Sequence, residues 1–509
     1  MLLILLLLAA VLLLPTLKIH FKNRRFSRYI DHLPGEKKYP VIGTMWRSLN
    51  CRREELADYF LARHKRFGPI FRSWMGSIPM VMVYKPEHAQ VVFRSSCANH
   101  KGLFYQMLTP WLGNGLIAGS GPKWQQHRKI ISPSFHFKVL DSYTEIFAEK
   151  AEQFSKYLEK YEGQGYFDIT EDLTKIALDI IAESAMGVEL NYLNGNDRRG
   201  VEYAQAIIEF CSIFFKRMAN PIYRNNFTFR YTALGRQSTQ YINTIEKFNN
   251  DIIQERKKRL QQSKEKTKFL MKDELNNRKK VSFLDLLLSY QNEHRFSEEE
   301  IKEEVSTFMF GGFDTTTATV TYALLALGND LQIQKHVQEE LDHIFAGDPG
   351  RKVTPQDISE MEYLDRVVKE VLRCYNFVPF IYRELQSDLE VAGVTLPKGI
   401  NIGVSLYDLH HDPVHYPDPY KFDPDRFLPE VCAQRHPYAY VPFSAGARNC
   451  LGQKFAMRNV KTLLSYILRQ YHVKCLEKPE NLKYFVEIVL RPQNGLHIVL
   501  EPRRLRRSG

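Results

Sequence analysis

The sequence predicts a mainly α-helical protein with a small β region, preceded by an amino-terminal membrane anchor. Apolar residues recur at spacings of three and four over long stretches, which is typical of amphipathic helices, while strand-like runs are short. Residues 2–14 form an unbroken apolar run. The chain has 509 residues, of which 44% are hydrophobic, so it can bury a large core, and the disordered and fibrous classes are excluded.

The apolar run begins at Leu2 and stays mostly apolar to Phe21. At about 1.5 Å per residue, some twenty helical residues span a hydrocarbon core of roughly 30 Å. No basic residue precedes the run and no small-residue cleavage site follows it, which favours a signal anchor over a cleaved signal peptide. Basic residues follow the run, and the positive-inside rule then places the body of the protein in the cytosol.

We therefore expect three segments along the chain. Residues 1–21 are the anchor helix, residues 22–43 are a basic, Pro- and Gly-containing hinge, and residues 44–509 form one globular domain. The seven cysteines are odd in number and never form a CxxC pair, which fits a reducing compartment and disfavours a disulfide framework.

The charge balance is positive, because 70 Lys and Arg residues outnumber 58 Asp and Glu residues and give a formal net charge of +12. Such a charge favours nucleic acid, a membrane surface or an acidic protein as partner. The sequence contains no zinc-finger spacing, recognition-helix pattern or RNA-binding aromatic motif, so nucleic acid is not expected.

The secondary structure follows from the spacing of apolar and turn residues. Helices are predicted over residues 147–186, 201–216 and 241–260. The charged stretch Gln262–Lys280 is predicted to be a loop. Strands are predicted at 70–72, 80–84 and 389–391, and a hairpin over 491–500 with Asn494-Gly495 as its turn.

A long central helix breaks the usual preferences. Ser297 and Glu300 form a capping box that opens a helix extending to about Leu327. Its middle is apolar nearly all round, yet it contains Gly311 and Gly312, each costing about 1 kcal/mol relative to alanine. Such a violation in a buried helix suggests function, because small residues admit a flat ligand. The structural alternative is a glycine contact between helices.

Cys450 is the sharpest feature of the sequence, because it follows a glycine-rich turn and precedes a helical pattern. A thiolate at a helix amino terminus is stabilised by free N–H groups and the helix dipole, and Arg448 adds a cation. Gly446 and Gly452 would let the backbone approach a large planar group, and Phe443 could shield the sulfur from water. The alternative is an inert core cysteine.

The pattern Phe443-x-x-Gly446-x-Arg448-x-Cys450-x-Gly452 resembles the haem-binding loop of the cytochrome P450 superfamily, the haem-thiolate monooxygenases. The resemblance extends from about Pro34 to Pro502. It implies a single fold of that type, with the long central helix over the haem. The other landmarks of the superfamily occur in order: Trp124-x-x-x-Arg128, Gly311–Thr316, Glu370-x-x-Arg373 and Phe422–Phe427.

A finer resemblance is to family four of that superfamily, the microsomal fatty-acid ω-hydroxylases, invertebrate members included. It is carried by residues 111–116, 124–129, 132–137 and 304–310. Many members have a glutamate that esterifies the haem where this chain has Gly311. The resemblance therefore implies haem b held without a covalent link, and without the pocket stiffening that accompanies terminal-carbon oxidation.

The resemblance also implies residue roles. Cys450 would be the axial ligand of the haem iron, and Asp314 and Thr315 would be catalytic, with the hydroxyl holding a water chain and the carboxylate supplying protons. The expected cofactor-binding residues are Trp124, Arg128, Arg383 and Arg448 at the haem propionates, with Phe443, Gly446 and Gly452 in the loop. Glu370, Arg373 and Arg426 would form a structural ion network under the haem.

As partners, the resemblance implies O2, NADPH electrons through a flavoprotein reductase, cytochrome b5 as a second donor, and the endoplasmic reticulum membrane with the domain on its cytosolic face. The reductase would dock on Lys123, Lys129, Lys454, Arg458 and Lys461, which could equally be a solvated face. The substrate would be apolar: a fatty acid, an isoprenoid hormone or a lipophilic xenobiotic. Two rivals stay open, a haem-thiolate isomerase or dehydratase of lipid peroxides that needs no reductase, and a non-catalytic, membrane-tethered lipid-binding protein.

Overall fold

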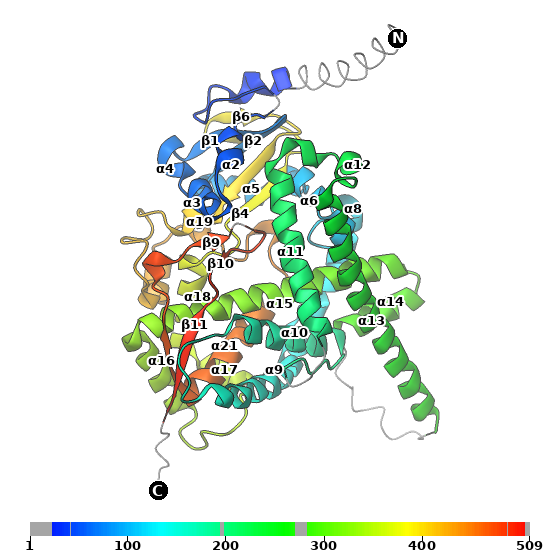
Figure 1. The fold of residues 1–509 in the computed structure, drawn as a ribbon, viewed down its shortest axis with the longest axis vertical. Coiled ribbons are helices and arrows are strands. Elements are labelled where there is room, and N and C mark those ends of the chain that lie inside the picture. The colour runs from blue at the N-terminus through cyan, green and yellow to red at the C-terminus, as the bar shows by residue number, and fades with distance from the viewer. Residues whose placement is uncertain (1–22, 41, 194–197, 270–281, 486, 504–509) are drawn as a thin grey trace.

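The computed structural model describes residues 23–40, 42–193, 198–269, 282–485 and 487–503 (Figure 1). Helices account for most of these residues and the strands are short, which confirms the predicted class. The helices are α2 (Trp46–Asn50), α3 (Leu56–Leu61), α4 (Arg63–Phe67), α5 (Pro86–Arg94), α6 (Leu103–Gln106), α7 (Thr109–Leu112), α8 (Gly121–Ile131), α9 (Phe137–Leu158), α10 (Thr170–Met186), α11 (Arg199–Ala219), α12 (Asn226–Phe229), α13 (Ala233–Phe269), α14 (Phe283–Asn292), α15 (Glu298–Asn329), α16 (Leu331–Ile344), α17 (Pro355–Glu360), α18 (Glu362–Cys374), α19 (Leu406–His410), α20 (Pro429–Ala433) and α21 (Gln453–Gln470).

The main sheet has the order β1-β2-β7-β4, in which β2 and β7 are parallel and the other pairs antiparallel. Figure 1 shows this sheet towards one end of the molecule, with α9, α10, α16 and α21 towards the other and α15 running across between them. The strands are β1 (Ile70–Met75), β2 (Ile78–Val83), β3 (Phe167–Asp168), β4 (Phe380–Glu384), β5 (Leu389–Val391), β6 (Val394–Leu396), β7 (Asn401–Ser405), β8 (Tyr471–Cys475), β9 (Tyr484–Phe485), β10 (Arg491–Pro492) and β11 (His497–Pro502).

The central helix α15 begins as predicted, because Ser297 accepts a hydrogen bond from the Glu300 N–H and Glu300 caps Ser297 in return. The helix is unbroken through its glycines and packs against α10, α13, α18 and α21. A Cβ on Gly312 would collide with the side chain of Ile181 on α10. A Cβ on Gly311 would meet nothing within 4 Å. The two glycines therefore differ: Gly312 permits helix packing, whereas Gly311 borders open space.

Two predicted helical boundaries are wrong. The pattern over residues 147–186 is divided between α9 and α10, because the chain turns at Gly163, whose φ is +71°. In the opposite sense, α13 continues to Phe269, into the stretch predicted as a loop from Gln262. Lys, Glu and Gln are good helix formers, so this helix needs no apolar face to continue. The rest of that predicted loop, residues 270–280, lies outside the described residues.

The predicted hairpin over residues 491–500 is also wrong. β10 pairs with β9, while β11 pairs with β8 and β3. The turn at Gly495 is real, with a φ of +72°, but the Leu496 N–H donates to Asp168 and directs the chain onto another sheet. Pro492 contributes no N–H to a hairpin ladder.

The segment predicted as a hinge is packed onto the globule rather than free. Residues 23–30 are helical, and Phe26, Ile30 and Leu33 are buried in a core cluster that includes Trp74 of β1. The Arg72 N–H donates to the Pro34 carbonyl at 2.9 Å. The predicted anchor, residues 1–21, lies outside the described residues, and no helix within the described ranges is both long and apolar enough to span a bilayer.

The contrast between the two glycines gives a stability prediction. Gly312→Val should lower the free energy of unfolding by about 1–3 kcal/mol, because the added atoms have no room beside Ile181. The matched control Gly311→Ala should be neutral or raise it by up to about 1 kcal/mol, since alanine is the better helix former. Thermal unfolding followed by circular dichroism measures both. Equal effects of the two variants would contradict the packing role of Gly312.

Candidate functional site

The loop that carries Cys450 is held in a fixed shape. It lies between a short 3₁₀ turn, Gly446–Arg448, and α21, and the Cys450 N–H donates to the Phe443 carbonyl at 2.8 Å. Gly446 has a φ of +72°, and a Cβ there would collide with the carbonyl of Phe93 at the end of α5. Glycine at 446 is thus required by a neighbouring helix as well as by its own conformation.

The environment of the Cys450 sulfur balances opposing effects. Burial raises the pKa of the thiol, while the Gly452 N–H and the Arg128 guanidinium lower it. The Cys450 side chain is itself solvent-accessible, although the protein surrounds it closely enough for burial to dominate its pKa. Its accessible face therefore borders a confined space rather than bulk water. The sequence predicted that Arg448 would stabilise the Cys450 thiolate. In the structure it is Arg128 that lowers the pKa of the thiol. A further positive charge at this space would favour the thiolate.

The predicted propionate-binding residues come from separate elements. Trp124 and Arg128 lie on α8, Arg383 on β4 and Arg448 beside the Cys450 loop. The Arg448 guanidinium carbon lies 3.4 Å from the centre of the Trp124 ring. Trp124 donates its Nε1–H to the Leu116 carbonyl, so its ring, rather than its N–H, supports the arginine.

Arg448 still has unused hydrogen-bonding capacity. Its Nε donates to the Asn99 carbonyl at 2.9 Å and its Nη2 to the Gly119 carbonyl at 2.8 Å. Its Nη1 is buried and has no hydrogen-bond partner. Buried donors are nearly always satisfied, so this atom points to an acceptor supplied by a bound group.

The positive charges around Arg448 reinforce this conclusion. Burial lowers the pKa of Arg448 to about 9, with repulsion from Arg383 and Arg128 adding to it. The pKa of Lys101 is also lowered by burial and by Arg383 and Arg448. Within the described ranges, no acidic side chain forms an ion pair with this basic cluster, which we define as Lys101, Arg128, Arg383 and Arg448. A group with two carboxylates, such as haem, fits this cluster.

The residues predicted to be catalytic lie on the middle of α15. Thr315 donates its hydroxyl hydrogen to the Gly311 carbonyl at 2.8 Å, so the polar group is held inside its own helix. The backbone beside it is open at Gly311, where a side chain would meet nothing. This stretch can therefore border a ligand without a side chain between the ligand and the helix.

Asp314, the carboxylate expected to supply protons, is paired with an arginine. It is buried and accepts a hydrogen bond from Arg491 of β10, with which it forms an ion pair. Burial raises the pKa of Asp314, and Arg491 opposes that shift. Arg491 is also 3.5 Å from a carboxylate oxygen of Glu487. The carboxylate is therefore restrained by Arg491 of β10.

The predicted ion network is assembled around α18. Arg373 pairs with Glu370 through two contacts, of 2.6 and 2.8 Å, and both side chains are fully buried. Arg373 also donates to the carbonyls of His410 and Pro419, and Arg426 lies 3.5 Å from Glu370. The network therefore ties α18 to the segment that leads into the Cys450 loop.

Lys101 and Arg491 were missed by the sequence analysis as site residues. Lys101 stands in no recognisable motif, and Arg491 was assigned only to a hairpin. Neither has a local sequence signal, because each acts on residues far along the chain: Arg383 and Arg448 for Lys101, and Asp314 for Arg491.

Removing one member of the buried pair should be severe. Glu370→Gln leaves Arg373 buried without its counter-charge and should lower the free energy of unfolding by about 3–5 kcal/mol. The control Asp425→Asn removes an exposed partner of Arg366 on the same helix and should change it by less than about 1 kcal/mol. Thermal unfolding and soluble yield report both; similar stability of the two variants would argue against the network.

Comparison with known proteins identifies the family of the chain. The family model described as Cytochrome P450 matches residues 33–499. Cytochrome P450 4c21 of Blattella germanica is 37% identical over 497 residues, covering 97% of this chain and 98% of that protein. Cytochrome P450 4V2 of Mus musculus is 40% identical over 92% of this chain and 89% of its own. Cytochrome P450 4c3 of Drosophila melanogaster is 36% identical over 95% and 91%. The predicted resemblance, including family four, is confirmed, and the chain belongs to the cytochrome P450 family.

Proposed function

We propose that this protein is a haem-thiolate monooxygenase that inserts one oxygen atom of O2 into an apolar substrate, using NADPH electrons from a flavoprotein reductase. The observation that carries the proposal is Cys450 in the loop just before α21, next to a basic cluster that has no acidic partner among the described residues. Family membership supports the oxidoreductase class and the haem iron.

In this proposal Cys450 would be the thiolate ligand of the haem iron, and the basic cluster would hold the two propionates. Arg448 has the unpartnered Nη1, and Trp124 keeps its guanidinium in place by stacking. Bound haem iron supplies the oxygen-activating chemistry, which a thiolate ligand favours by pushing electron density onto the metal. Gly311 offers no side chain for an ester, so we propose that the haem is held without a covalent link.

Thr315 and Asp314 are the groups we assign to proton handling. The Thr315 oxygen keeps free lone pairs while its hydrogen is bound to the Gly311 carbonyl, so it can accept a hydrogen bond from water. Asp314 holds a proton more readily than an exposed aspartate, because burial raises its pKa. To exchange that proton, its carboxyl must move away from Arg491.

For the reductase, the docking face expected from the sequence needs revision. Lys461 is buried beside Asp365 and Lys123 lies 3.1 Å from Glu300, so these two are engaged within the protein. Lys129 and Lys454 are exposed, and we assign docking to them. Cytochrome b5 would use the same face. Attachment to the endoplasmic reticulum membrane through residues 1–21, with the domain in the cytosol, is part of the same proposal.

The first test is the carbon monoxide difference spectrum of the reduced protein. The wild-type chain should give a thiolate-type Soret band, and Cys450→Ala should lose it. Cys432→Ala removes an exposed cysteine as a control and should keep the band. In the same preparation, acidic organic solvent should extract all of the haem. Well-folded, haem-loaded protein without the band would overturn the ligand assignment.

The second test is coupling. Thr315→Ala should raise the NADPH consumed per product, because a water bound there during turnover would lose the Thr315 hydroxyl as its partner. Thr319→Ala, one turn further along α15, should leave coupling unchanged. Stoichiometry of NADPH, O2 and product with added reductase measures this. Tight coupling in Thr315→Ala contradicts the proposed role of Thr315 in proton handling. Product formation without NADPH supports the isomerase or dehydratase instead. Ligand binding without oxygen uptake supports the lipid-binding protein.

A further inference from the structure

A buried carboxylate on the first half of α15 holds the loop that precedes α8. Glu304 is fully buried. One of its oxygens lies 2.9 Å from Nδ1 of His127 on α8, and the other accepts the Leu116 N–H at 3.1 Å. A carboxylate only accepts hydrogen bonds, so Nδ1 of His127 carries the hydrogen of this contact. Glu304 therefore joins α15 to α8 and to residues 113–120, which we call the α7–α8 loop.

The surroundings of Glu304 make these two contacts important. Burial raises the pKa of Glu304, while His127 and the Leu116 N–H oppose that shift. The second ring nitrogen of His127 lies 3.6 Å from Glu300, which in turn lies 3.1 Å from Lys123. A residue at 304 that accepts only one hydrogen bond would leave a buried donor without a partner, which is costly.

A first series of contacts connects Glu304 to Arg448 through a tryptophan. Leu116, whose N–H is held by Glu304, accepts the Nε1–H of Trp124 through its carbonyl at 3.2 Å. The ring of Trp124 in turn lies 3.4 Å from the guanidinium carbon of Arg448. The carboxylate therefore fixes the residue that fixes the supporting ring.

A second series of contacts follows the α7–α8 loop itself. The Gly119 N–H donates to the Gly115 carbonyl at 2.8 Å, and the Gly119 carbonyl accepts from Nη2 of Arg448 at 2.8 Å. The Ser120 hydroxyl oxygen lies 3.4 Å from the same Nη2 and accepts the Lys101 N–H at 2.8 Å. The loop therefore presents two acceptors to Arg448 in fixed positions.

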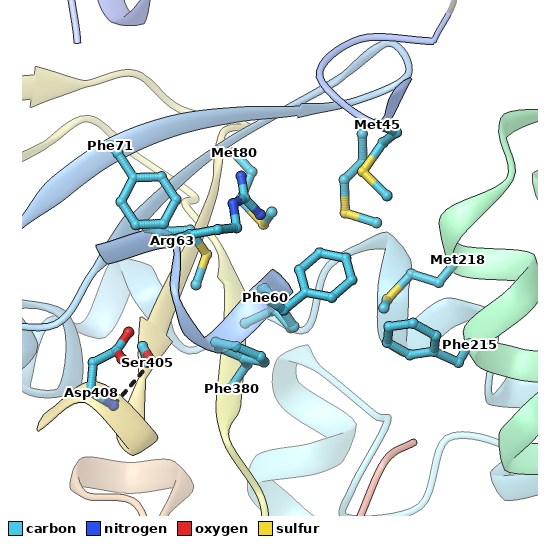
Figure 2. Close-up of a pocket in the computed structure, with 13 residues that line it drawn as sticks. Met45, Phe60, Arg63, Phe71, Met80, Phe215, Met218, Phe380, Ser405 and Asp408 are labelled. Carbon is cyan, nitrogen blue, oxygen red and sulfur yellow. Dashed lines mark hydrogen bonds between the residues drawn. The ribbon is translucent and has the colours of Figure 1, made fainter. Parts of the chain in front are cut away.

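Arg63 of α4 is another buried arginine with an unpartnered nitrogen, and it is held differently (Figure 2). Its Nη2 donates to the Ser73 hydroxyl at 2.9 Å, and its guanidinium carbon lies 5.0 Å from the centre of the Phe71 ring, so both contacts come from β1. It lines an apolar cavity of about 30 Å³, which has room for about two waters and not for a larger group. Arg448 is instead oriented by the α7–α8 loop and α8 together.

We propose that Glu304 is a positioning residue for Arg448, because it fixes the α7–α8 loop and thereby aims Nη1 of Arg448 at a carboxylate of the cofactor. This inference rests on the proposed function, which assigns the haem propionates to the basic cluster. Nη1 is the buried nitrogen of Arg448 that has no partner. A planar guanidinium matches a carboxylate only in the correct orientation, so its supports determine the strength of the contact.

The test is the rate of haem transfer from the full-length holoenzyme to excess apomyoglobin. Glu304→Gln should raise this rate about tenfold, which corresponds to the loss of one charge-assisted hydrogen bond. His127→Asn keeps an N–H near the position of Nδ1 and should change the rate less than about twofold. His127→Leu removes that donor and should raise the rate as Glu304→Gln does.

Asp179→Asn is the matched control. Asp179 of α10 is also a buried carboxylate that accepts two backbone N–H groups of a loop, those of Tyr192 at 3.0 Å and Leu193 at 3.3 Å. This variant should lose about as much thermal stability as Glu304→Gln and leave haem transfer unchanged. An equal rise of the transfer rate in both variants would mean that each acts through stability alone, and it would overturn the proposal.

A double variant tests whether Glu304 acts through Arg448. Arg448→Lys keeps the positive charge and loses the planar fork, so adding Glu304→Gln should raise the transfer rate less than about twofold further. A further tenfold rise contradicts the proposal. Hydrogen exchange of residues 113–120 in the holoenzyme should accelerate in Glu304→Gln, and this readout does not depend on haem retention by Arg448→Lys. Unchanged exchange contradicts the proposal as well.

The carbon monoxide spectrum separates this inference from the proposed function. A thiolate band in the wild type, together with haem transfer that Glu304→Gln does not change, rejects only the role of Glu304. Absence of the band in well-folded, haem-loaded wild type rejects the haem-thiolate assignment itself.

Discussion

The basic cluster of Lys101, Arg128, Arg383 and Arg448, which has no acidic partner among the described residues, is the feature on which the candidate site depends. Burial lowers the pKa of Lys101, Arg383 and Arg448, and repulsion from Arg383 adds to the effect on the other two. A chain that gathers such groups in its interior is incomplete by itself, because the repulsion must be offset by a ligand. The fold contributes the scaffold: α8, β4 and the Cys450 loop each bring one arginine, and the Glu370–Arg373 pair fixes the segment leading to that loop.

In the central helix α15, the absence of side chains at Gly311 and Gly312 has structural consequences. Gly312 lets α10 approach, and Gly311 leaves the helix surface bare where Thr315 and the predicted cofactor would meet. The two adjacent glycines therefore differ in role: the helix contact that the sequence left open applies to Gly312, while the approach of a flat ligand stays a prediction for Gly311. The cost in helix propensity is accepted at both positions for reasons visible only in three dimensions.

Local patterns predicted much of the structure. The capping box at Ser297, the strands near Ile70 and Met80 and the helix after Cys450 were all readable, because each depends on residues close in the chain. The pairing of β11 with β8 was not readable, since a turn at Gly495 is compatible with either partner. The Arg491–Asp314 pair joins residues 177 positions apart, so no window of sequence could reveal it.

The docking of residues 23–40 onto β1 has a mechanical consequence. A flexible linker would let a globular body rotate freely about its point of attachment. Here Phe26 and Ile30 are buried against the sheet and the Pro34 carbonyl holds Arg72, so the start of the described chain is rigidly continuous with β1. Any tether made through the preceding residues would therefore be short and rigidly attached to the globular body. It would set the tilt of the whole body, and with it the direction in which ligands approach.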